Sequence, residues 1–228
     1  MANRYFTPET FAFLTTLANN NNRDWFEAHK QEYEATVRTP ALAFIGDMAS
    51  ELAMISPHFL ALPKKVGGSL MRVHRDTRFG KDKRPYKCNI GIHFRHEVGK
   101  DVHAPGYYLH IESGNCFAGV GIWRPDAAAL GKIRDAIIAN DKHWLTARDD
   151  KAFRKHFTPD GEVLTNPPRG YAKDHPLIND LKRKDFIAAA TLSEESITSK
   201  NLLATITEHF EQATPYMSFL CKALELRF

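Results

Sequence analysis

The chain has 228 residues, of which 43% are hydrophobic and 25% are charged, so it can bury a core and lacks the composition of a disordered protein. No apolar run approaches the roughly 20 residues that span a bilayer, and the first ten residues hold no apolar signal-peptide core; we therefore expect a cytoplasmic protein without a membrane partner. A net charge of +4 is too small by itself to identify a nucleic-acid-binding protein.

The first third of the chain predicts helices. Thr7 followed by proline and glutamate is typical of a helix start, and the four asparagines at 19–22 should end this helix and cap the next. The second helix is predicted over roughly 23–37. Thr39, again followed by proline, predicts the start of a third helix, in which the apolar positions recur at helical spacing.

The middle of the chain predicts an antiparallel sheet. Alternating or apolar stretches rich in aromatic and β-branched residues occur at 69–75, 87–95, 107–112 and 116–123. The sequence "ESGNC" at 112–116 indicates a tight hairpin turn between the last two of these strands. We expect an α+β fold with a single domain over 1–228, in which four or more antiparallel strands pack against N-terminal and C-terminal helices.

The last part of the chain returns to helices. Helices are predicted from 127 to about 140, over 149–157 and near 177–184, followed by a short strand at 187–192. A final helical region from about 201 should break or kink at Pro215. The segment 158–176 is rich in proline and glycine and is long for a loop, which is typical of functional loops.

Three cysteines, at positions 88, 116 and 221, are far apart and form no metal-binding spacing, so we expect reduced thiols. The sequence gives no GxSxG motif and no cysteine placed beside a histidine by a known motif. A nucleophilic enzyme is therefore not indicated.

Alternation along the predicted strands gathers polar side chains on one face of the sheet. This face should carry Arg72, His74, His93, Arg95, Tyr108, His110 and Glu112. Three glycines, at 91, 119 and 121, would leave room there for a polar ligand. The alternative is an ordinary solvated sheet face without a function.

Three histidines of this face could ligate a metal across neighbouring strands: His74, His93 and His110. The spacing along the sequence places no Asp or Glu beside these histidines, so no metal site is predicted.

The segment "RVHRDTRFGKDKRPYK" at 72–87 has seven Lys or Arg side chains in sixteen positions. A loop of this kind between two strands can surround an anion, and we expect it to bind phosphate or carboxylate. The candidate ligand-binding residues are Arg72, Arg75, Arg78, Lys81, Lys83, Tyr86 and Lys87. The alternative is a solvated loop whose charges pair with Asp76 and Asp82.

Four ordered motifs span nearly the whole chain: "NNNNRDWFEAHKQEYEATVRTP", "RVHRDTRFGKDKRPYKCNI", "GYYLHIESGNCFAGVGIWRPD" and "NPPRGYAKDHPLINDLKRKDF". Together they resemble one known family, that of the domain of unknown function 2461. The resemblance implies a single-domain protein without an established activity. The chain departs from the family pattern at Gly80, where the pattern has serine, and at Cys88, where it has threonine, so a serine hydroxyl is not expected to bind phosphate here.

The fourth of these motifs contains a cluster of residues that could close over the anion site expected at 72–87. Its residues are Arg169, Gly170, Tyr171, His175 and Pro176. Arg169 is therefore a further candidate for ligand binding.

Three functions remain open at this point. The first is an enzyme or binding protein for a small anionic ligand, with Asp76, Glu112 and His175 as candidate catalytic groups. The second is a nucleic-acid-binding module, in which four aromatic side chains would stack on bases: Phe79, Tyr86, Tyr108 and Trp123. The third is a non-catalytic interaction protein that docks a partner through the 158–176 loop and the N-terminal aromatic residues. The cofactor and the oligomeric state stay undetermined.

Overall fold

The computed structural model describes residues 5–78, 81–99 and 104–228. Within these ranges it contains a six-stranded antiparallel sheet with the strand order β1-β2-β3-β4-β6-β5. The strands are β1 (Phe59–Leu60), β2 (Ile90–His96), β3 (Gly106–Ile111), β4 (Cys116–Ile122), β5 (Thr158–Asp160) and β6 (Phe186–Leu192). The predicted α+β class and the predicted antiparallel sheet are confirmed.

The three central strands form the predicted meander, and their alternation is as expected. Ile92 and Phe94 of β2 are fully buried, as are Tyr107 and Leu109 of β3, whereas His93 and Tyr108 between them are partly exposed. One side of the sheet therefore faces the core and the other faces outward.

The segment predicted as the first strand, 69–75, is not a regular strand. It pairs with β2 and with the residues just before β2 through two isolated β-bridges, Leu70 to Ile92 and His74 to Tyr86. Between the two bridges lie three residues of the first segment, 71–73, and five of the second, 87–91, so the pairing contains a bulge. The buried side chains are consequently Leu70 and Val73, whereas Met71, which simple alternation would place on the same side as Val73, is 38% exposed.

The N-terminal helices are α1 (Pro8–Asn19), α2 (Arg23–Ala28), α3 (Lys30–Tyr33), a π-helical turn (Glu34–Arg38) and α4 (Thr39–Ile55). Asn22 caps α2 as expected, because its side chain accepts a hydrogen bond from the Trp25 amide at 2.9 Å. Helix α4 starts at Thr39, as predicted, but no break separates it from the preceding helical turn. The π-helical turn continues directly into α4, and its wider hydrogen-bonding pattern accommodates Pro40, which lacks an N–H.

The C-terminal helices are α5 (Ala127–Ala139), α6 (Asp141–Arg148), α7 (Lys151–His156), α8 (Ile178–Leu181), α9 (Glu194–Ile197), α10 (Leu202–Gln212) and α11 (Thr214–Ala223). The helical region breaks at Ala213, one residue before α11, which carries Pro215 in its first turn, as predicted. Four short elements were not predicted from the sequence: β1, β5, α6 and α9. No helix in the described part of the chain is long and apolar enough to cross a membrane.

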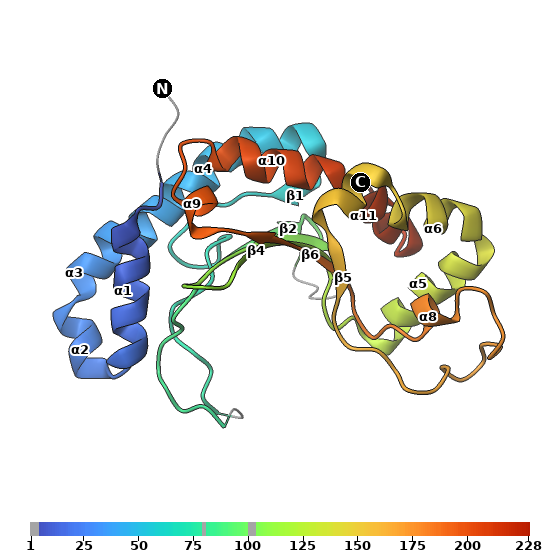
Figure 1. The fold of residues 1–228 in the computed structure, drawn as a ribbon, viewed down its shortest axis with the longest axis horizontal. Coiled ribbons are helices and arrows are strands. Elements are labelled where there is room, and N and C mark those ends of the chain that lie inside the picture. The colour runs from blue at the N-terminus through green and yellow to red at the C-terminus, as the bar shows by residue number, and fades with distance from the viewer. Residues whose placement is uncertain (1–4, 79–80, 100–103) are drawn as a thin grey trace.

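The sheet is curved, and helices α4, α9 and α10 cover its convex side (Figure 1). On this side Tyr107 packs against Phe210 of α10 with ring centroids 4.6 Å apart, and the buried apolar side chains form one continuous cluster. Two segments extend past the concave side at its opposite ends: residues 61–89 beside α1–α3, and the 161–176 loop beside α5 and α8 (Figure 1).

Candidate functional site

The basic segment, residues 72–87, is anchored to the N-terminal helices near its C-terminal end, at Tyr86. Tyr86 is buried and stacks on Phe26 of α2, with ring centroids 4.0 Å apart and an angle of 18° between the rings. Asn21 holds the same point through both ends of its side chain amide: Oδ1 accepts from the Tyr86 amide at 3.0 Å, and Nδ2 donates to the Tyr86 carbonyl at 2.9 Å. The segment therefore leaves the body of the protein from a fixed position. Tyr86, predicted to contact a ligand, serves as this anchor.

Replacement of Asn21 by alanine should destabilise the protein by about 2 kcal/mol, because two partly buried backbone groups of Tyr86 lose their partner. It should also accelerate tryptic cleavage within the basic segment. Urea unfolding and limited proteolysis measure the two effects. Asn20→Ala is the matched control, since the side chain of Asn20 bonds within its own helix end, where its Nδ2 donates to the Thr16 carbonyl. Equal tryptic rates in the wild type and Asn21→Ala would contradict the anchoring role.

Part of the charge of the basic segment is neutralised within the segment. Arg78 pairs with Asp76 at 2.8 Å, and Asp82 pairs with both Arg84 at 2.8 Å and Arg75 at 2.9 Å. Hydrogen bonds from Arg78 and Arg84 hold the pKa of the two carboxyl groups far below the usual range. Asp76, a candidate catalytic residue, is thus engaged as a carboxylate.

Lys87 is different from these paired cations. Its side chain is half-buried, and no carboxylate of the described chain lies within ion-pair distance of it. Burial, followed by the positive charges of Arg72 and Arg75, lowers the pKa of its ammonium group. Three cationic side chains therefore gather at this point without an equal number of acids.

Lys87 lies at the junction of the basic segment, the start of β2 and the N-terminal helices. Its neighbours Tyr86 and Cys88 contact Phe26 and Asn21. Lys87 and Asn89 line a small cavity with Met71, and the other walls of this cavity include Leu14, Leu17, Tyr33 and Val37 of the N-terminal helical region. The basic segment thus meets the sheet at the start of β2.

We call the outward side of β2, β3 and β4 the polar face; its side chains are Asn89, His93, Arg95, Tyr108, His110, Glu112 and Phe117. A chain of hydrogen bonds runs along β3 within this face. The Tyr108 hydroxyl lies 3.2 Å from His110 Nδ1, and His110 Nε2 lies 3.1 Å from Glu112 Oε2. Since a carboxylate only accepts, Nε2 carries the proton and Nδ1 accepts from Tyr108. Burial, and then the charge of Glu112, raise the pKa of Tyr108 to about 12, which keeps its hydroxyl a donor.

Glu112 connects the polar face to the basic segment. The pKa of the Arg84 guanidinium is raised mainly by Asp82 and to a smaller extent by Glu112. His110 is further held by stacking on Phe117, with ring centroids 4.8 Å apart. The imidazole of His110 is therefore fixed in position and tautomer, as a proton-transferring group requires.

The glycines of this face make room for protein side chains. A Cβ atom at Gly91 would lie 2.7 Å from the Tyr108 hydroxyl, and one at Gly106 would lie 2.4 Å from His93 Nε2. Gly119 lies under the ring of Phe117 and beside Cβ of Tyr108. The space that we expected a ligand to occupy at Gly91 and Gly119 is thus filled by aromatic rings.

Other predicted residues lie apart from this group. His74 contacts Tyr86 and Phe26, with ring centroids 5.2 and 6.5 Å away, on the side of the N-terminal helices. The described residues contain no group of three His, Cys, Asp or Glu side chains that could hold a metal ion. Phe79 and Gly80 lie outside the described residues.

The second predicted cluster is at the other end of the molecule. The 161–176 loop, which carries Arg169 and His175, lies beside α5 and α8, whereas the basic segment lies beside α1–α3 (Figure 1). Tyr171 donates to Asp135 of α5 at 2.9 Å, and His175 Nδ1 accepts from the Leu177 amide at 3.0 Å. The structure therefore does not bring this cluster to the basic segment.

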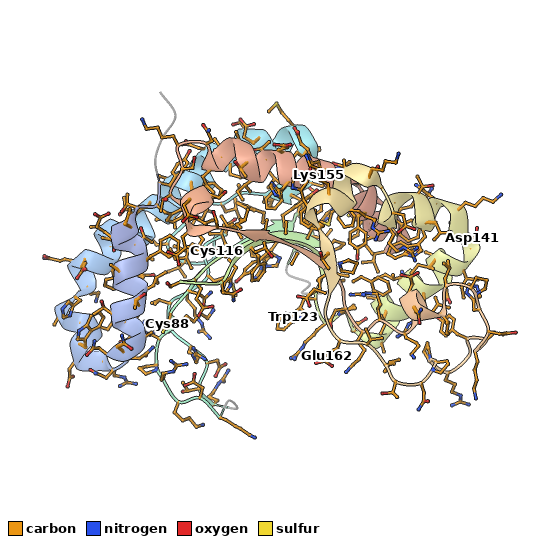
Figure 2. The ribbon with its side chains drawn as sticks, viewed as in Figure 1. Cys88, Cys116, Trp123, Asp141, Lys155 and Glu162 are labelled. Atoms are coloured by element: carbon orange, nitrogen blue, oxygen red, sulfur yellow. The ribbon has the colours of Figure 1, made fainter. Side chains whose placement is uncertain are left out.

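The aromatic residues considered for docking divide into two groups. Phe26 and Tyr33 are buried and Trp25 packs against the core, so they support the N-terminal helices. Trp123, by contrast, is 63% exposed and lies on the concave side at the end of β4 (Figure 2). The guanidinium of Arg124 lies over its ring, 4.7 Å from the centroid.

A comparison with protein families gives one match, to the model described as conserved hypothetical protein (DUF2461), over residues 9–219. The chain belongs to the DUF2461 family. No curated protein and no solved structure matches it. The DUF2461 match covers the basic segment, the polar face and the 161–176 loop, and it confirms the resemblance carried by the four sequence motifs.

Proposed function

We propose that this protein binds a small anionic ligand, carrying a phosphate or carboxylate group, where the basic segment meets the polar face. The observation that carries the proposal is the half-buried Lys87, with Arg72 and Arg75 close enough to lower its pKa and no carboxylate of the described residues paired with it. A cation in this position is costly alone and is stabilised when an anion binds.

The distribution of charge supports the same place. Seven Lys or Arg against two Asp give residues 72–87 a net charge of +5, while the whole chain has +4, so the other 212 residues together carry −1. The excess positive charge of the protein is thus concentrated in one segment. Such a field attracts anions toward the adjoining face.

The neighbouring side chains could add specificity. Asn89 lines the same cavity as Lys87 and lies 3.4 Å from His110 Nδ1, in the Tyr108–His110–Glu112 chain of hydrogen bonds. These groups can orient a polar ligand and exchange a proton with it.

Lys87→Met should reduce the affinity for the anionic ligand about 10- to 100-fold, the loss expected for a charge-assisted hydrogen bond. The measurement is a thermal-shift screen with nucleotides and sugar phosphates at low salt, followed by calorimetric titration of any compound that raises the melting temperature. Lys200→Met is the control, since Lys200 is an exposed lysine beside α9.

Two results would contradict the proposal: no stabilisation by any phosphate or carboxylate compound, or equal stabilisation of the wild type and Lys87→Met. A third possible result concerns the ligand class. The exposed Trp123 with its stacked Arg124 favours single-stranded nucleic acid as a second candidate. Binding of an oligonucleotide that weakens steeply with salt, without binding of small anions, would replace the proposal by this candidate.

A further inference from the structure

A pocket of about 360 Å³ lies at the junction of α7, β5, β6 and α10. The strand order places it at the sheet edge opposite to β1 and the basic segment. The polar side chains that line it are Lys155, His156, Thr158, Asp160, Thr191 and His209. Figure 2 shows Lys155 near the start of β5 and Trp123 on the concave side, so the pocket is separate from the end of β4.

The pocket forms because β5 is shorter than β6. Thr158–Asp160 pairs only with Ile187–Ala189, and the chain preceding β5 turns away into α7. The rest of β6, Ala190–Leu192, extends beyond the paired part, and Thr191 is exposed there. Helix α7, helix α10 and this end of β6 therefore surround an open space.

Two imidazoles from different helices meet in this space. The rings of His156 and His209 meet edge to face, with an angle of 65° between their planes and centroids 4.6 Å apart. His209 is buried and its Nδ1 lies 2.6 Å from the Thr205 carbonyl, to which it donates. His156 Nε2 has no accessible surface and no hydrogen-bond partner among the described residues. An unpaired buried polar atom is costly, so a ligand that draws the ring toward the pocket and bonds to it would be favoured.

The charges around His156 come from three elements. Lys155 precedes it on α7, His209 and Glu208 face it from α10, and Asp160 lies across the pocket on β5. Burial, followed by His209 and Lys155, lowers the pKa of His156, and Glu208 opposes this change. In the free protein the ring is therefore neutral at pH 7.

We propose that this pocket is a second ligand site, which binds a small phosphomonoester. Lys155, Thr158, Thr191 and the imidazole of His156 supply donors for the phosphate oxygens. Asp160, which accepts through Oδ1 from the Gly161 amide at 2.7 Å, adds an acceptor for a phosphate that keeps its proton. The volume is at the lower end of the range for small-molecule sites and leaves room for a short organic group beyond the phosphate.

The pocket should bind more tightly as the pH falls. A bound phosphate stabilises the protonated form of His156, so binding takes up a proton, and the monoprotonated ester also suits Asp160. The affinity should rise by up to about tenfold per pH unit below pH 7. Sulfate has no O–H at these pH values, so its oxygens would face the carboxylate of Asp160 as like charges. It should therefore bind at least tenfold more weakly than phosphate.

The test is calorimetric titration of the full chain with glycerol 3-phosphate, inorganic phosphate and sulfate between pH 6 and 8. His156→Phe keeps a ring and removes both nitrogens, and it should reduce the affinity for glycerol 3-phosphate at least tenfold. Thr191→Val, at an exposed position, should weaken binding severalfold and guards against a folding defect in the first variant. Lys200→Met, at an exposed position beside α9, should bind glycerol 3-phosphate as the wild type does.

The proposal is overturned if the wild type shows no binding, if His156→Phe and Thr191→Val bind as the wild type does, or if sulfate and phosphate bind equally. Loss of binding in Lys87→Met alone would assign the phosphate to the polar face instead. The two sites are thus tested separately.

Discussion

Gly121→Ala should lower the free energy of unfolding by roughly 3 to 5 kcal/mol, the largest loss that we expect from a change of one methyl group in this protein. Gly121 lies in β4 with φ of +111°, where a side chain is strained. A Cβ atom there would also lie 2.0 Å from the carbonyl oxygen of Phe186 in the adjoining strand β6. Because this neighbour is backbone in the middle of the sheet, it cannot move aside.

Urea unfolding of Gly121→Ala and of Gly131→Ala measures this effect against a matched control. Gly131 is in helix α5, and nothing lies within 4 Å of a Cβ built there. Alanine at Gly131 should therefore stabilise the protein by up to about 1 kcal/mol through helix propensity. A loss below about 1 kcal/mol for Gly121→Ala would show that the pairing of β4 with β6 differs from the one described.

The second large effect is a loss of stability in acid that depends on His93. Burial, and then the charge of Arg95, lower the pKa of His93 to about 4, and Arg95 Nε donates to its Nδ1 at 3.2 Å. The unfolded chain binds a proton at His93 near pH 6.5, whereas the folded protein does so only near pH 4. Between these values the unfolded state holds more protons, so stability falls as the pH falls through this window.

His93→Gln should remove this dependence. From pH 7 to pH 5 the wild type should lose about 2 kcal/mol more than the variant, which follows from the two pKa values. Urea unfolding at both pH values measures the difference, and His143→Gln, at an exposed position of α6, is the control. Equal losses in the wild type and His93→Gln would mean that solvent reaches the ring of His93.

The sheet could be predicted because it has one buried and one open side. In β2, β3 and β4 apolar residues recur at every second position and are buried, and several of the glycines between them are buried as well. The same rule placed His93, Tyr108, His110 and Glu112 together. The same alternation puts Asn89 and Phe117 on this face, where both contact His110, although the predicted set did not include them.

Alternation fails where the backbone is irregular. The bulge between the bridges of 69–75 and β2 turned Met71 outward and put His74 beside Phe26. A bulge leaves no pattern in the residue types, since it depends on the partner strand. The two-residue strand β1 and the three-residue strand β5 are too short to show a period at all.

Contacts between distant segments were the hardest to predict. Segments 72–87 and 161–176 both looked suited to hold a ligand, and the sequence does not tell that the sheet lies between them. The pairing of His156 with His209 likewise depends on the packing of α7 against α10, which nothing in either helix indicates. Local patterns define elements and their faces, whereas the arrangement of elements depends on the whole core.

The position of β6 inside the sheet affects the order in which the chain can fold. Partners in the β3–β4 hairpin are 7 to 15 residues apart, whereas those of β4 and β6 are 64 to 76 residues apart. During synthesis at about 5 to 20 residues per second, the edge of β4 therefore waits several seconds for its partner. That edge is apolar and rich in glycine, and its unpaired amides can bind another chain in the meantime. The step most exposed to aggregation is thus the late insertion of β6, which also completes the wall of the histidine pocket.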